Sequence, residues 1–209
     1  MFDCRHRPLR LPDELVAELA AAYGEPHRAY HNVAHIAEVL GWFDRVADDV
    51  GWLEPAEVYT AIVFHDAIYQ PGAKDNESRS AQWMHKARLA AGVEPKSGLS
   101  LDAIMVDRDR VAELIELTAR HGHIEKADHD AALFLDSDMA IVGSPPEQFA
   151  AYDAAIAVEY KHVPPDAYRT GRRAFLEGLL AKPRIFLTDY FHNRLDAQAR
   201  ANLTKALTD

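Results

Sequence analysis

The chain has 209 residues, 48% of them apolar and 27% charged, which is the composition of a globular protein and not of a disordered one. Its net charge of −10 argues against broad binding to a nucleic-acid backbone or to an anionic membrane surface. The single Cys4 excludes an internal disulfide, and neither a signal peptide nor a run of 18 apolar residues is apparent. These features predict a cytoplasmic protein without membrane contact.

In the first part of the chain, apolar residues recur at the three-to-four spacing of helices that bury one face. Alternation typical of strands appears nowhere convincingly. Pro and Gly residues, which end or begin helices, mark the boundaries. The expected helices here are 11–23, one that runs from His35 past Val46, 56–69, one from Glu77 to near Gly92, and 109–120, with a turn and short connector at 98–105.

The second part continues the helical pattern, interrupted by Gly143-Ser144-Pro145-Pro146. The expected helices are 127–142, one carrying Phe149 to Tyr160, 165–180, 184–191 and 196–207. The sequence therefore predicts an all-α fold, a single-domain helical bundle over 1–209. Its core is expected at about 27–143, with the C-terminal helices 147–208 packed on it.

The dipeptide His65-Asp66 carries the strongest chemical signal. His65 continues the apolar stripe of Val58 and Ile62, and Asp66 follows it directly. A carboxylate in apolar surroundings needs a compensating cation, yet no Lys or Arg occurs between Arg45 and Lys74. A metal ion would meet that need, since imidazole and carboxylate suit divalent cations. The alternative is a buried His bonded to a carbonyl beside a solvent-facing Asp.

Two more polar residues fall on apolar stripes of other expected helices. His35 begins the apolar face of the second helix, and Asp138 lies on the apolar face of 127–142. His31 competes with His35, because the two are four residues apart and could bind a metal from one helix face. Asp136 competes with Asp138, although the pattern places Asp136 off the apolar face. Together these residues predict a metal site with open coordination positions.

The order of a His, a His-Asp pair and a later Asp on successive helices resembles the HD superfamily of metal-dependent phosphohydrolases. More narrowly, a set of segments resembles a small bacterial family of predicted HD phosphohydrolases. The segments that carry this resemblance are RAYHNVAHI, FHDAIY followed by DNESRSA, FLDSDMAIVG, VEY, GRRAFL and ARANL. The resemblance covers about 27–203.

The resemblance implies a helical bundle of the HD-domain type and a small phosphorylated substrate, with nucleotides as one option. Its ligand positions fall on His35, His65, Asp66 and Asp138. The divalent metal ion could be Mn, Mg, Fe, Co, Ni or Zn. Asp66 would also orient water or take its proton.

Other residues are weaker candidates for the site. His121 continues the inward line of 109–120 and could contact phosphate or a second metal, or simply end the helix. Arg172 suits a bidentate phosphate contact, or a buried salt bridge to Glu159 or another acid. Asn76 and Glu77 could reach the active site or cap the helix that they begin.

Two other functions remain open from the sequence. One is a non-catalytic module in which the metal anchors a nucleotide. The other is a di-iron oxygenase of the HD type, for which His31 and His121 could supply extra ligands.

Overall fold

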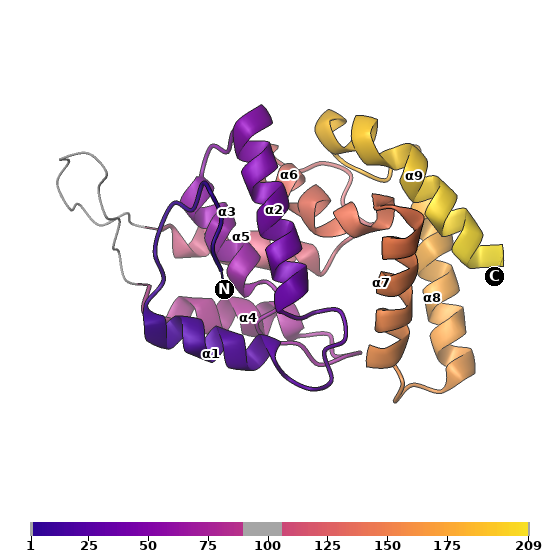
Figure 1. Ribbon diagram of the computed structural model, residues 1–209, viewed down its shortest axis with the longest axis horizontal. Coiled ribbons are helices and arrows are strands. Elements are labelled where there is room, and N and C mark those ends of the chain that lie inside the picture. The colour runs from indigo at the N-terminus through magenta and orange to yellow at the C-terminus, as the bar shows by residue number, and fades with distance from the viewer. Residues whose placement is uncertain (1, 90–105, 209) are drawn as a thin grey trace. The chain divides into compact units, whose positions relative to one another are not determined.

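A computed structural model describes residues 2–89 and 106–208 of the chain (Figure 1). The described residues contain helices and no strand, so the predicted all-α class is confirmed. No helix in this part of the chain has the length and apolar run needed to cross a bilayer. The elements are α1 (Asp13–Tyr23), α2 (Val33–Asp49), α3 (Pro55–Phe64), α4 (Asn76–Lys86), α5 (Arg108–Thr118), α6 (His129–Met139), the 3₁₀-helix η1 (Ala140–Gly143), α7 (Pro146–Glu159), α8 (Pro165–Leu180) and α9 (Asp189–Thr208).

The chain forms two compact units, Met1–Ala119 and Arg120–Asp209. In the first unit α3 is the central helix, and it packs against α2, α4 and α5. From Val58 to Phe64 every side chain is buried, which explains why this helix has no polar face. Pro55 occupies the first turn of α3, where its missing N–H costs no hydrogen bond.

The second unit contains α6, η1, α7, α8 and α9. The long α9 packs against η1, α8, α6 and α7. At η1 the backbones approach so closely that a Cβ on Gly143 would lie 2.6 Å from the Cβ of Leu195. Gly143, expected only to interrupt the helical pattern, therefore also permits this contact.

Several expected helices differ in extent from the observed ones. The helix predicted over 56–69 ends at Phe64, and 65–68 form a turn. The helices predicted over 184–191 and 196–207 are a single helix, α9, which begins only at Asp189. Nothing between Phe191 and Asp196 breaks a helix, whereas 184–188 lack a regular helical conformation. The helix predicted to run to near Gly92 ends earlier, at Lys86. The connector predicted at 98–105 lies outside the described residues.

The only cysteine is in a setting that suppresses thiolate formation. Burial raises the pKa of Cys4 to about 12, and the nearby Asp44 carboxylate adds to the increase. Asp44 is held in place because it accepts hydrogen bonds of 2.9 Å from the backbone N–H groups of Arg5 and His6.

We therefore expect iodoacetamide to alkylate Cys4 at pH 8 about three orders of magnitude more slowly in the folded chain than in urea, because the thiolate is the nucleophile. Mass spectrometry of timed samples measures both rates. Equal rates would show that the thiol is not protected.

Candidate metal centre

His35 lies in the first turn of α2 and is buried. The helix begins at Val33 because the side chain of Asn32 accepts a hydrogen bond of 2.8 Å from the N–H of Ala34. This cap sets the helix register, and with it the direction of the His35 side chain. Because α2 begins at Val33, His31 precedes the helix. The prediction that His31 and His35 could bind a metal from one helix face is therefore wrong.

His65 and Asp66 lie where α3 ends. The N–H of His65 still bonds to the carbonyl of Ala61 at 2.8 Å, so His65 keeps its place in the register of the helix. Its Nδ1 lies 2.9 Å from the carbonyl oxygen of Ile62. Because a carbonyl only accepts, Nδ1 carries the hydrogen, and Nε2 of the neutral ring carries a lone pair. The ring thus has the tautomer of a metal-binding histidine with a supported second nitrogen.

Three ligand-type atoms converge at this point of the first unit. Nε2 of His35 and Nε2 of His65 are 3.2 Å apart. Asp66 Oδ2 lies 3.1 Å from His65 Nε2 and 3.5 Å from His35 Nε2. Ligands about 2.1 Å from one ion are separated by about 3.0 Å in an octahedron and about 3.4 Å in a tetrahedron. The three spacings therefore match one shared cation.

The chemistry of the cluster also fits a cation. The lone pair of neutral His65 faces a carboxylate oxygen, and these two electron-rich atoms repel unless a proton or a metal lies between them. Burial alone would raise the pKa of Asp66, but the positive charges that His65, His31 and His35 carry when protonated outweigh burial and hold this pKa below its usual value. Asp66 is thus an anion surrounded by imidazoles, which is a suitable donor set for a divalent ion.

Arg28 holds the turn that contains Asp66, a role that the sequence did not reveal. Its guanidinium donates hydrogen bonds to the carbonyls of Asp66 at 2.6 Å, Ala67 at 3.0 Å and His31 at 3.1 Å. A fourth bond, of 2.9 Å, goes to the carboxylate of Glu25. The side chain is completely buried. The carbonyls of Asp66 and Ala67 lie in the turn after α3, so Arg28 satisfies backbone acceptors of that turn.

His31 lies beside the cluster without belonging to α2. Its ring stacks on Tyr69 with the centroids 4.1 Å apart, and its centroid is 5.9 Å from that of His35. His31 also contributes to lowering the pKa of Asp66. It is therefore a neighbour of the candidate site, while His35 is the histidine that shares the point of convergence.

The two aspartates of α6 have different roles in the second unit. Asp136 is buried and accepts three hydrogen bonds, from the N–H groups of Leu187 and Thr188 at 2.8 Å each and from the Thr188 hydroxyl at 2.7 Å. It fixes the residues that precede α9. The expectation that Asp136 lies off the buried face is thus wrong, and its carboxylate is used in structure. Asp138 is only partly buried and lies 2.7 Å from His121 Nε2.

Asp136→Asn should lower the stability of the chain by about 1–3 kcal/mol, because an amide cannot accept all three hydrogen bonds and leaves a buried N–H without its acceptor. Asp138→Asn should cost less than about 1 kcal/mol, since that side chain is nearer to solvent. Urea unfolding followed by circular dichroism measures both changes. Equal losses for the two variants would contradict the assignment of Asp136 as the structural carboxylate.

His121 follows α5 in the chain but is not part of it, because that helix ends at Thr118. The helical line expected to continue to His121 is therefore interrupted by a turn, in which Gly122 has a φ of 79° that favours glycine. Since a carboxylate accepts, Nε2–H of His121 donates to Asp138. The pair orients both side chains within the second unit.

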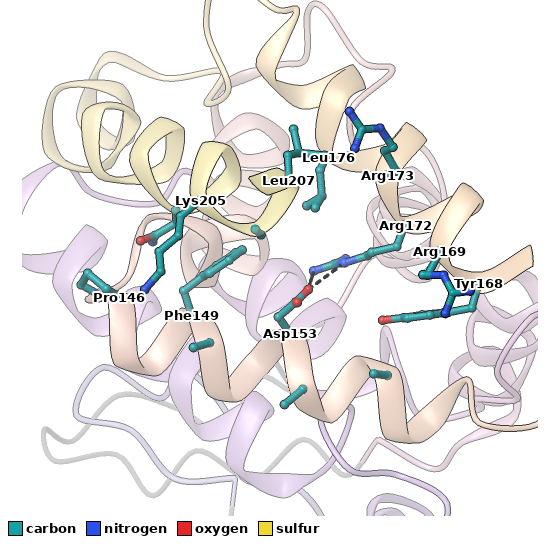
Figure 2. A pocket seen from close by; sticks show the side chains of 15 residues that line it. Pro146, Phe149, Asp153, Tyr168, Arg169, Arg172, Arg173, Leu176, Lys205 and Leu207 are labelled. Atoms are coloured by element: carbon teal, nitrogen blue, oxygen red, sulfur yellow. Dashed lines mark hydrogen bonds and ion pairs between the residues drawn. The ribbon is translucent and has the colours of Figure 1, made fainter. Parts of the chain in front are cut away.

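Arg172 of α8 forms the predicted alternative of a salt bridge with Glu159 or another acid, and its partner is Asp153. Its Nε and Nη2 lie 2.9 and 2.6 Å from one oxygen of Asp153 (Figure 2). Its Nη1 donates to the Tyr152 hydroxyl at 3.3 Å. The guanidinium also packs over the ring of Tyr152. Burial raises the pKa of Tyr152, Arg172 opposes this, and the charge of Asp138 adds to the increase.

Asn76 and Glu77 occupy the first turn of α4. The side chain of Asn76 accepts from the N–H of Gln70 and donates to its carbonyl, both at 3.0 Å, and so closes the loop between them. Asn76 thus serves the structure of the loop. Glu77 is half-buried beside it, and its predicted contact with the active site stays a prediction.

Glu38 is a further acidic residue near the cluster that sequence reasoning missed. It lies on α2, one turn after His35, and burial raises its pKa while the charge of His35 opposes the rise. The three-residue spacing from His35 was the available signal, but Glu38 looked like an ordinary polar position of an amphipathic helix.

Comparison of the chain with protein-family models, with curated proteins and with solved structures finds no match.

Proposed function

We propose that the chain is a metal-dependent phosphohydrolase that acts on a small phosphate ester, with nucleotides among the candidate substrates. His35, His65 and Asp66 would hold a divalent ion, and Asp138 would be the fourth ligand. The observation that carries the proposal is the convergence of the first three side chains, with spacings of 3.1–3.5 Å between their ligand atoms. The HD-type order of the same residues in the sequence supports it.

The residues of the proposed site would have different roles in hydrolysis. A divalent ion held there supplies Lewis acidity, which polarises a phosphoryl oxygen and acidifies water. Asp66, whose pKa lies below the usual range, stays ionised near neutral pH and can orient a water or accept its proton. His121, whose Nε2–H is bound by Asp138, would in its protonated form give the proton on Nδ1 to the leaving oxygen. Arg172 is already paired with Asp153, so a contact with substrate phosphate would require this pair to open.

Replacing a convergent ligand should remove both metal and activity. His65→Ala and Asp66→Ala should each weaken metal binding by more than the roughly 10–100-fold that follows loss of a supporting residue. Mass-spectrometric metal analysis of protein purified without chelator measures retention. Hydrolysis of p-nitrophenyl phosphate and its diester, each with added Mn, Mg, Fe, Co, Ni or Zn, measures activity.

His85→Ala is the matched control, because His85 is an exposed histidine of α4, 3.7 Å from Asp109. It should keep the metal and the activity of the parent chain. Full metal retention and full activity in Asp66→Ala would end the proposal.

The two aspartates of α6 provide a second test. The variant that loses less stability should lose more metal affinity and activity. Asp138→Asn should lower metal affinity and hydrolysis, while Asp136→Asn, the less stable variant, should retain both below its unfolding transition. The same metal analysis and assays apply. If Asp136→Asn loses metal while folded and Asp138→Asn keeps it, Asp138 is not the fourth ligand.

One observation favours a second candidate. Because Arg172 is engaged with Asp153, the charge that would stabilise a phosphate in the transition state is reduced, which suits a module that binds a metal-anchored nucleotide without hydrolysing it. Nucleotide binding without turnover across the tested metals would support this candidate. Iron at two ions per chain, lowered by His31→Ala, would instead favour the di-iron alternative.

A further inference from the structure

A cavity of about 530 Å³ lies within the second unit and is lined by residues of α7, α8 and α9 (Figure 2). This volume is in the range of small-molecule sites. The cavity contains none of the residues assigned above to the metal, and Arg172 is the only lining residue that the sequence suggested as a site residue. Its wall has two parts of different chemistry.

The first part is apolar. Phe149 and Leu176 are buried side chains of α7 and α8, and Leu207 comes from the end of α9. The alanines Ala150, Ala154 and Ala157 recur along α7 at helical spacing and leave room beside the Phe149 ring. Together these residues offer a surface to a hydrocarbon or an aromatic body of a ligand.

The second part is cationic. Four basic side chains line the cavity, Arg169, Arg172, Arg173 and Lys205, against one acid, Asp153. The chain as a whole has a net charge of −10. Four basic side chains around one cavity therefore stand out in an acidic protein. Their charge would attract small anions into the cavity.

Arg172 is the fixed member of the cationic group. Asp153 and the Tyr152 hydroxyl bind its guanidinium, and the ring of Phe175 lies 5.3 Å from its central carbon. Only 13% of the side chain is exposed. A guanidinium held in this way loses little conformational entropy when a ligand binds.

The other three basic side chains can bind a ligand anion, two of them by exchanging an ion-pair partner. Arg169 and Arg173 form exposed ion pairs along α8, with Asp166 and Glu177. Such pairs contribute little, so a ligand anion can replace the partner at small cost. Lys205 forms no ion pair with any residue of 2–89 or 106–208. Figure 2 shows its ammonium group between Pro146 and Phe149.

We propose that this cavity binds a small anionic amphiphile, a carboxylate or phosphate monoester on an apolar body, with the anion on the cationic side chains of α8 and α9 and the body against Phe149, Leu176 and Leu207. A cationic ligand would be repelled by the four basic side chains that line the cavity beside a single lining acid, and a neutral one would gain nothing from them. This site is independent of the proposed metal centre.

Titration calorimetry of the full chain with four ligands of one chain length tests the proposal. Octanoate and octyl phosphate should bind at least about tenfold more tightly than octan-1-ol, and octylammonium should not bind. Added salt should weaken the two anions. The stronger of the two identifies the head group. Equal affinity for octanol and octanoate, or no binding of either anion, would overturn the proposal.

Charge removal at exposed positions tests the location. The double variant Arg169→Gln/Lys205→Gln should weaken the tighter anion about tenfold without affecting folding, since both side chains are exposed. Arg184→Gln is the matched control, because Arg184 is an arginine of the same unit, paired with Asp189 and outside the cavity. Ala154→Leu, which fills the cavity from α7, should weaken the anion and the alcohol alike. An unchanged double variant, or an equal loss in Arg184→Gln, would contradict the assigned site.

Discussion

The candidate centre depends on how Arg28 holds the backbone just after α3. The helix ends at Phe64 with carbonyl groups that no further helical turn can satisfy, and the guanidinium of Arg28 binds the carbonyls of Asp66 and Ala67. This keeps 65–68 in a compact turn. As a result His65 retains its helical direction, while Asp66 departs from the helix and its carboxylate turns toward the same point as the imidazole. A continuous helix would have separated the two side chains by about 100°.

The arrangement is costly without a cation, and this cost is the physical argument for a metal. Two imidazole nitrogens and a carboxylate oxygen lie within 3.5 Å of one another in a buried place. The hydrogen bond from His65 Nδ1 to Ile62 directs a lone pair into this group. Apolar side chains would fill the same volume of the core at a lower free-energy cost.

Periodicity predicted most of the helices, since each buries an apolar stripe whose spacing is visible in the sequence. It also placed His35 and His65 together in the core. It failed where a long-range polar contact decides the structure. Asp136 appeared to lie off the buried face because its partners, Leu187 and Thr188, are distant in sequence and bind it through the backbone N–H of one and the backbone and hydroxyl of the other.

The same limit explains the other differences. The turn at Asp66 requires Arg28, which is 38 residues away in the sequence, and a helical pattern cannot show where a distant cation will bind. The sequence allowed a salt bridge of Arg172 with Glu159 or another acid, but it did not single out Asp153, which lies opposite Arg172 across α7 and α8. Side-chain pairing between helices depends on their relative rotation, which the apolar stripe fixes only within the width of a face.

The bonds of Asp136 have a consequence for how the second unit responds to change. Because this carboxylate joins α6 to the residues that start α9, and Asp138 lies only two positions further along α6, a disturbance near Thr188 is passed to the His121–Asp138 pair through a single helical turn. Substitutions just before the last helix are therefore restrained by the hydrogen bonds that Asp136 accepts there. Substitutions at 187 and 188 are therefore expected to affect the position of Asp138, and they are not neutral changes in a surface loop.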